Sequence, residues 1–239
     1  LTLQASAQTQ IGNSNFEAWE TTTSETAEPI NWNSFMTADA TGIYSAAKQP
    51  QMDRSTDTRP GSTGGYSAKI WTRVVPVFNI KANGNMTLGR IKAGSTTPND
   101  PANHNKTIQS DPNFSEAFMD TPDSVVFWVK YIPTTPSTTL KAKASFVIHK
   151  SLASGDFKDP NDVTGANSVA TAITEISYNS GNWQRMAVKF DYIGNPADAA
   201  YMIATFTSCY TPGGGNGNDA LFIDDINFYL SLERFGVDS

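Results

Sequence analysis

Residues 124–132 read SVVFWVKYI, and residues 140–150 read LKAKASFVIHK. The first segment is rich in β-branched and aromatic residues and ends at Pro133, which is typical of a strand. The second segment alternates with a period of two, so Phe146 and its alternate neighbours face a core while Lys143 and its alternate neighbours face away. We expect two strands, joined as an antiparallel hairpin by the loop between them.

The same strand character recurs along the rest of the chain. Alternating or continuous apolar runs lie at 65–75, 171–178, 183–192, 201–207 and 221–229. Helical periodicity is confined to a short candidate at 112–118. Many short strands separated by turns indicate an all-β chain. We therefore predict a β-sandwich of jelly-roll topology, with long loops at 49–64 and 93–120 and at most one or two short helices.

The length of 239 residues is enough for one large β domain. The sequence contains no evident linker and no internal repeat, and we predict a single domain over residues 11–231. We expect residues 1–10 to be a signal-peptide remnant or a disordered N-terminus, because Ala5-Ser6-Ala7 fits the small-x-small cleavage pattern. Residues 232–239 are expected to form a C-terminal tail.

The composition narrows the classes of function. The formal net charge is -6, and 17% of the residues are charged. Nucleic-acid binding needs a basic surface, so this charge argues against it. The single cysteine, Cys209, excludes an intramolecular disulfide and is expected to be a small buried residue. No apolar run is long enough to insert the domain into a membrane.

Two motifs stand near the chain ends. NSNFEAW lies at 13–19 and is followed by PINW at 29–32, while LFIDDINFY lies at 221–229. Both end motifs read as strands with carboxylates beside aromatic residues. We expect these first and last strands to meet in the sandwich. A third motif, GGYSAKI at 64–70, stands between them.

These motifs, in this order, resemble those of carbohydrate-binding jelly-roll modules of the galactose-binding-like type. FWVKYIP at 127–133 is similar to a strand of the family called "putative carbohydrate metabolism domain", and the resemblance covers residues 11–230. It implies an exported protein of a bacterial polysaccharide-utilisation system, in the periplasm, at the outer cell surface or secreted. It also implies an oligo- or polysaccharide partner and neighbouring surface proteins of glycan uptake.

The resemblance further implies a structural calcium ion between the first and last strands. Glu17, Asp224 and Asp225 stand at the matching positions, and calcium prefers such oxygen ligands. Alternation puts Asp224 on the face of Phe222 and Ile226, where an unpaired carboxylate is costly. The alternative is that these carboxylates cap loops or accept hydrogen bonds from backbone N–H groups.

A sugar would be bound by flat aromatic rings with polar side chains around them. The candidate residues are Tyr44, Arg54, Trp71, Trp128, Lys130 and Lys143. Trp128 and Lys130 share one face of their strand. In the expected hairpin this face would join Lys141, Lys143 and His149 in an open polar groove. The alternative for each tryptophan is a place in the core of the sandwich.

We predict a glycan-recognition module and favour a protein that is not an enzyme. One alternative is a glycoside hydrolase or lyase, and glycoside hydrolysis needs two carboxyl groups about 5 to 10 Å apart. The loop carboxylates that could supply them are Asp53, Asp57, Asp111, Glu116 and Asp120. Nothing in their spacing selects a pair, and with only two histidines no Ser-His-Asp or zinc pattern emerges. The second alternative is a structural or adhesive surface protein.

Overall fold

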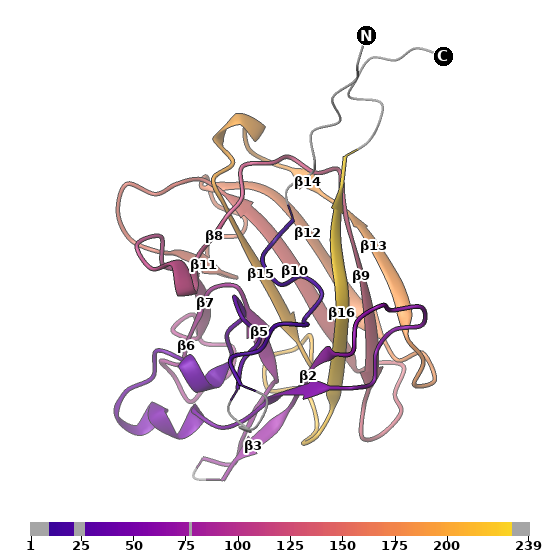
Figure 1. Cartoon of the computed structure of the whole chain (residues 1–239). Helices are drawn as coiled ribbons and strands as arrows, with labels where there is room; N and C mark the ends of the chain where they lie inside the picture. The colour runs from indigo at the N-terminus through magenta and orange to yellow at the C-terminus, as the bar shows by residue number, and fades with distance from the viewer. Residues whose placement is uncertain (1–9, 22–26, 77, 231–239) are drawn as a thin grey trace.

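Two antiparallel sheets pack face to face in the computed structural model, which describes residues 10–21, 27–76 and 78–230 (Figure 1). The first sheet has the strand order β1 (Met52–Ser55), β2 (Ser67–Trp71), β16 (Ala220–Tyr229), β9 (Ser124–Ile132) and β13 (Gln184–Lys189). The second sheet has the order β14 (Asp191–Tyr192), β12 (Ser168–Ser177), β10 (Lys141–His149), β15 (Tyr201–Thr207) and β5 (Asn85–Thr87), with β8 (Glu116–Ala117) also paired to β15. The predicted all-β sandwich of jelly-roll topology is confirmed.

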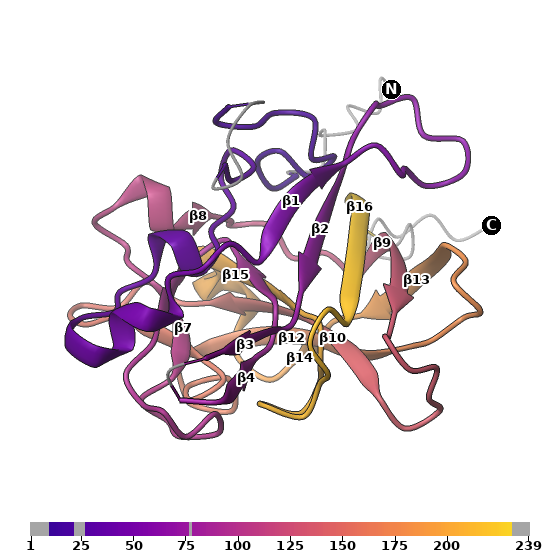
Figure 2. The ribbon, with the colours of Figure 1, turned by 90° about the horizontal axis from the view of Figure 1, so that it is seen from below.

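A smaller sheet covers part of the outer face of the second sheet, away from the core. It comprises β6 (Arg90–Lys92), β7 (His104–Thr107) and β11 (Phe157–Asp159), and Figure 1 shows it beside β15. Val147 of β10 and Ile203 of β15 pack against Phe157 of β11, so this outer face carries an apolar cluster of its own. A hairpin of β3 (Arg73–Val75) and β4 (Ile80–Ala82) lies on the same side of the sandwich as β7 (Figure 2).

The helices are all short. The described residues form four 3₁₀ helices, namely η1 (Phe35–Thr37), η2 (Gly42–Ala47), η3 (Pro112–Phe114) and η4 (Pro196–Asp198). The helix η3 lies inside the predicted segment 112–118. It begins there because Pro112 presets φ and the Asp111 carboxylate accepts a hydrogen bond from the backbone N–H of Asn113. None of the helices in the described ranges is long and apolar enough to cross a membrane.

The hairpin predicted for residues 124–132 and 140–150 is wrong. Both strands form, but β9 pairs with β16 and β13, whereas β10 pairs with β12 and β15. A hairpin would have placed both apolar faces on the same side of one sheet. The sandwich instead sets them against each other, and the ring centroids of Phe127 and Phe146 lie 5.4 Å apart between the sheets.

The N-terminal motif at 13–19 is a turn, and its prediction as a strand is wrong. Asn13 and Phe16 have φ values of 49° and 57°, in the left-handed region that no strand uses. The motif nevertheless lies beside β16, because the Ile226 N–H donates to the Ser14 carbonyl oxygen at 2.9 Å. The two chain ends therefore meet as expected. The expected signal remnant, apart from Gln10, and the C-terminal tail at 232–239 lie outside the described residues.

Aromatic rings from both sheets form the centre of the core. Phe127 of the first sheet meets Phe206 of the second edge-to-face, with ring centroids 5.5 Å apart. Phe146 meets Phe206 and Phe228 in the same way, at 5.6 and 6.0 Å. Each of these four side chains is at most 1% exposed. Edge-to-face pairs add about 0.5–1.5 kcal/mol each to the free energy of burial, so this cluster fixes how the sheets face each other.

His149 shows how completely the outer face of the second sheet is covered. It points away from the core as predicted, yet it is fully buried beneath the smaller sheet. Its ring stacks on Phe157 at 4.1 Å between centroids, and its Nε2 lies 3.0 Å from the Thr107 hydroxyl. Burial lowers the pKa of His149 to about 4, because the charged imidazolium would lose its hydration.

Removing one ring from the core should be strongly destabilising. We expect Phe146→Ala to lower the free energy of unfolding by about 3–5 kcal/mol, because it leaves a cavity between the sheets. Urea unfolding measures this change. Ile193→Ala is the matched control, since this side chain is 51% exposed and its loss should change stability by about 0.5 kcal/mol or less. Equal effects of the two substitutions would contradict the assignment of the core.

Stability should fall in mild acid because of His149. A histidine whose pKa is lowered by folding contributes its full stability above the unfolded value of about 6.5. That stability is lost as the pH falls towards the folded pKa of about 4. We expect His149→Gln to flatten the pH dependence between these values, measured as urea midpoints against pH. An unchanged slope in the variant would assign the acid sensitivity to other groups.

Candidate ligand-binding cavity

A cavity of about 240 Å³ lies on the outer face of the second sheet, between that sheet and the smaller elements that cover it. Its floor is polar and is formed by strands of the second sheet and of the smaller sheet. Lys143 of β10, Thr207 of β15 and Asn85 of β5 lie in one register row across three adjacent strands. Asp159 of β11 and Asn105 of β7 are also register partners and complete the floor.

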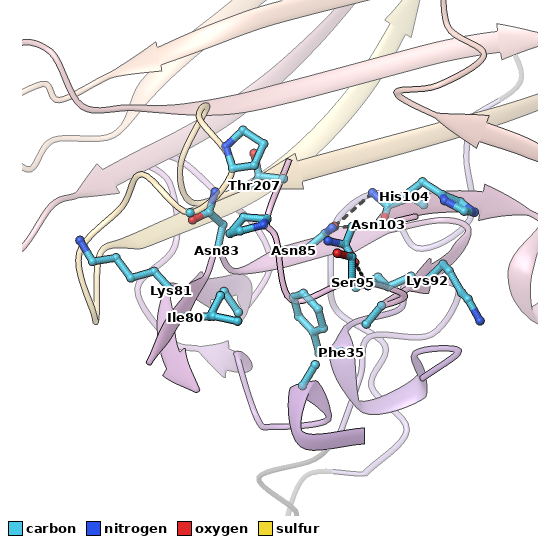
Figure 3. Close-up of a pocket in the computed structure, with 18 of the residues that line it drawn as sticks. Phe35, Ile80, Lys81, Asn83, Asn85, Lys92, Ser95, Asn103, His104 and Thr207 are labelled. Atoms are coloured by element: carbon cyan, nitrogen blue, oxygen red, sulfur yellow. Dashed lines mark hydrogen bonds between the residues drawn. The ribbon is translucent and has the colours of Figure 1, made fainter. Parts of the chain in front are cut away.

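The walls of the cavity are largely apolar. Phe35 of η1 and Tyr44 of η2 pack beside Ile91 of β6. Figure 3 shows Phe35 and Ile80 lining the space opposite Asn83, Asn85 and Thr207. Phe78, Tyr210 and three prolines also line the cavity. A concave site with apolar rings around a few polar groups is the usual form of a small-molecule binding site.

Asparagine side chains hold the loops that form the rim. The Asn103 Oδ1 accepts hydrogen bonds from the N–H groups of Gly94 and Ser95, both at 3.0 Å, and its Nδ2 donates to the Thr97 carbonyl. Figure 3 shows Asn103 beside Ser95. On the other side, the Asn83 Nδ2 donates to two carbonyl oxygens of the segment 209–211. These amides replace the sheet contacts that a loop lacks, and they set the position of the rim.

The floor carries one ammonium group and one carboxyl group. Asp159 is 4% exposed, and burial raises the pKa of its carboxyl, while Lys143 and a hydrogen bond with Thr205 act in the opposite direction. Lys143 lies near the Tyr210 ring, with its Nζ 5.8 Å from the ring centroid. In the part of the chain that the structure describes, Lys143 forms no salt bridge.

The structure brings together two of the six predicted ligand-binding residues. Tyr44 and Lys143 both line the cavity. Arg54, Trp71, Trp128 and Lys130 belong to strands of the first sheet, on the other side of the core. The predicted groove that joined Trp128 and Lys130 with Lys143 is therefore wrong, because β9 and β10 lie in different sheets.

The face that carries Trp128 and Lys130 is covered by the loop between β1 and β2. Figure 1 shows this loop crossing in front of β16. Asp57 of the loop forms a salt bridge with Lys130 and accepts a hydrogen bond from the Trp183 Nε1 at 3.0 Å. The Arg59 guanidinium lies 5.6 Å from the Trp128 ring centroid. Trp128 is half-buried and Lys130 only 9% exposed, so this face is not an open groove.

The remaining two predicted residues of this sheet also have partners. The Arg54 guanidinium lies over the Tyr66 ring, 4.2 Å from its centroid. The Lys69 Nζ lies 5.6 Å from the centroid of the Trp71 ring. Neither Arg54 nor Trp71 lines the cavity.

The three carboxylates predicted to bind calcium have separate partners. The Glu17 carboxylate accepts hydrogen bonds from the backbone N–H groups of Gly65 and Tyr66, at 3.0 and 2.9 Å. Asp225 forms a salt bridge with the Arg59 guanidinium. Asp224 is fully buried, and its Oδ2 accepts a hydrogen bond from the Arg59 N–H, while its Oδ1 has no hydrogen-bond partner among the described residues.

These contacts do not fit a single calcium ion bound by all three carboxylates. A cation near Asp225 would have to displace Arg59, and within the described residues no three acidic, histidine or cysteine side chains form a metal-binding group. Burial raises the pKa of Asp224 to about 6. Calcium at the chain ends stays a prediction, and a chelator tests it. A fall in Tm with EDTA that Ca²⁺ reverses would support the ion, and an unchanged Tm would remove it.

The carboxylates considered for hydrolysis do not gather in the cavity. Asp111 caps η3, Glu116 accepts a hydrogen bond from the Gly12 N–H, and Asp57 is bound to Lys130. Among the described residues, Asp159 is the one carboxylate that lines the cavity. A pair of carboxyl groups, as glycoside hydrolysis requires, is therefore not present there.

Sequence reasoning missed most of the cavity. Phe35, Phe78, Asn83, Asn105 and Asp159 line it, and none of them stands in a recognisable motif. Asp159 lies in the run DFKDPND at 156–162, which is rich in acidic and turn-forming residues, yet it belongs to the edge strand β11. The long loop predicted at 93–120 was one sequence feature that indicated part of the cavity, because it contains the lining residues Ser95, Asn103 and Asn105.

Comparison with known proteins finds no matching family model and no significant match among curated proteins. Several solved structures are similar to this chain, and two of them have TM-scores of 0.60 or above. A "putative glycoside hydrolase" from Bacteroides thetaiotaomicron is 17% identical with a TM-score of 0.64, over 94% of this chain and 72% of that chain. A "putative glycoside hydrolase" from Bacteroides vulgatus is 18% identical with a TM-score of 0.60, over 91% of this chain and 97% of that chain.

Both comparisons concern the fold, since fewer than one residue in five is identical. Carbohydrate-binding modules match with lower scores. One of them, in complex with β-1,4-galactotriose, is 9% identical with a TM-score of 0.38, over 92% of this chain and 97% of that chain. The described residues form a jelly-roll sandwich with a cavity on the outer face of one sheet.

Proposed function

We propose that this protein is a glycan-binding module without catalytic activity, and that its cavity holds one or two sugar units. The single observation that carries this proposal is the combination of aromatic rings and polar groups in one concave site. Phe35, Tyr44 and Tyr210 offer flat surfaces for the C–H faces of a sugar, while Lys143 and Asp159 offer hydrogen bonds to its hydroxyl groups.

The setting of the protein is part of the same proposal. An exported protein of a bacterial polysaccharide-utilisation system would meet oligo- and polysaccharides in the periplasm, at the outer surface or outside the cell. Neighbouring glycan-uptake proteins would be its partners there. The support is the resemblance of the end motifs, together with two structures of the same fold that are each described as a "putative glycoside hydrolase".

Binding without cleavage follows from the carboxyl groups of the cavity. A hydrolase of the usual kind needs two of them, and the described lining provides Asp159 alone. A glycan array with parallel detection of released reducing ends tests the proposal. We expect binding without release of sugar. Absence of binding to every glycan would overturn the proposal, and release of reducing ends would favour the hydrolase.

Affinity should depend on the aromatic rim. We expect Tyr210→Ala to weaken binding of the array's best ligand by roughly tenfold, because a ring that stacks on a ligand typically contributes more than about 1 kcal/mol. Isothermal titration calorimetry measures this change. Tyr229→Ala is the matched control, because Tyr229 is 47% exposed against 46% for Tyr210 but lies on β16 of the other sheet. An equal loss in both variants would remove the cavity as the binding site.

A further inference from the structure

The side chains that line the cavity carry more positive than negative charge, whereas the whole chain is negatively charged. The chain has a formal net charge of -6, yet the cavity is lined by Lys81, Lys92 and Lys143 and by Asp159 as the one carboxylate among the described residues. Figure 3 shows the side chains of Lys81 and Lys92 extending outward at opposite ends of the cavity. They therefore contribute to the potential at its rim, while Lys143 stands on the floor.

Lys81 and Lys143 both lack a salt bridge among the described residues, and Lys143 is the one of the two that stands on the floor. Lys92 forms a salt bridge with Asp39 at 3.1 Å, and the same carboxylate binds Lys106 at 3.3 Å. Lys143 forms no such bridge with a described residue, although it is half-buried. A partly desolvated ammonium that lacks a counter-charge favours an anion beside it.

Asp159 is the one carboxyl group of the described lining that could offset this charge. It is almost completely buried, and burial favours the neutral carboxylic acid over the carboxylate. Three lysines and one carboxyl group line the cavity, so positive charge is in excess there even when Asp159 is ionised. Thr205 and Thr207 of β15 add hydroxyl groups to the same floor.

We propose that the cavity selects saccharides that carry an anionic group, either the carboxylate of a uronic acid or a sulfate ester, and that Lys143 binds this group. The inference rests on the proposed glycan-binding function and specifies the class of glycan. The apolar walls at Phe35, Tyr44 and Ile80 contact the C–H face of the sugar, and the anionic substituent points to the floor.

Matched pairs of oligosaccharides test this inference on the full chain. One pair is an oligogalacturonide and its methyl ester, and the other is a sulfated galactan oligosaccharide and its desulfated form. Calorimetry gives the Kd of each member. We expect the acidic member of at least one pair to bind about tenfold more tightly, with a difference that shrinks as ionic strength rises. The pair that shows the difference identifies carboxylate or sulfate as the group recognised.

Substitution of Lys143 tests whether this side chain binds the anionic group. Lys143→Gln should bring the acidic and neutral members to similar affinities. Lys141→Gln is the control on the same strand face, because Lys141 lies outside the cavity and forms a salt bridge with Glu175. A preference for the acidic member that survives in a folded Lys143→Gln protein would overturn the role of Lys143. The comparison of ligand pairs with the unsubstituted chain does not depend on whether this variant folds.

The outcomes separate the two proposals. Equal binding of acidic and neutral members would overturn the anionic selectivity and leave glycan binding in place. Absence of binding to every member and to every glycan of the array would overturn both. Binding of neutral glycans alone would also overturn the anionic selectivity. It would indicate that Lys143 and Asp159 balance each other's charge and bind hydroxyl groups of the sugar.

Discussion

The packing of four phenylalanine rings between the sheets is the constraint on which the rest of the structure depends. Phe127, Phe146, Phe206 and Phe228 come from four strands and meet mostly edge-to-face, at centroid distances of 5.4 to 6.0 Å. Side chains alternate along a strand, so each ring that points inward fixes which neighbours point outward. Lys143, Thr205 and Thr207 reach the floor of the cavity because Ala144, Phe146 and Phe206 face the core.

The two sheets use their outer faces differently. On the first sheet, the loop between β1 and β2 lies across the strands, and Asp57 and Arg59 engage Lys130, Asp224 and Asp225. On the second sheet, the covering elements stay further from the floor near Lys143 and leave a cavity. This difference is why the proposed ligand site lies on the second sheet. Asp224 and Asp225 of the first sheet hold this loop through their contacts with Arg59.

The strands themselves were predictable from the sequence, because strand character depends on local alternation and on turn residues. The bounds of β9 and β15 agree with the predicted segments, and the chain ends meet as expected. Pairing was less predictable. The assignment of 124–132 and 140–150 to one hairpin failed because neighbours in sequence need not be neighbours in a sheet, and a jelly roll moves successive strands between sheets.

The sequence by itself determined an all-β sandwich, the faces of its long strands and the absence of a recognisable catalytic motif. Only the tertiary structure decided where a ligand can bind. Phe35, Asn83, Asn105 and Asp159 lie far apart in the chain and converge because η1, β7 and β11 cover one part of the second sheet. No local pattern in the sequence predicts this convergence. The burial that raises the pKa of Asp159 arises from packing between distant segments. Packing also sets the place of Lys143, which forms no salt bridge with a described residue.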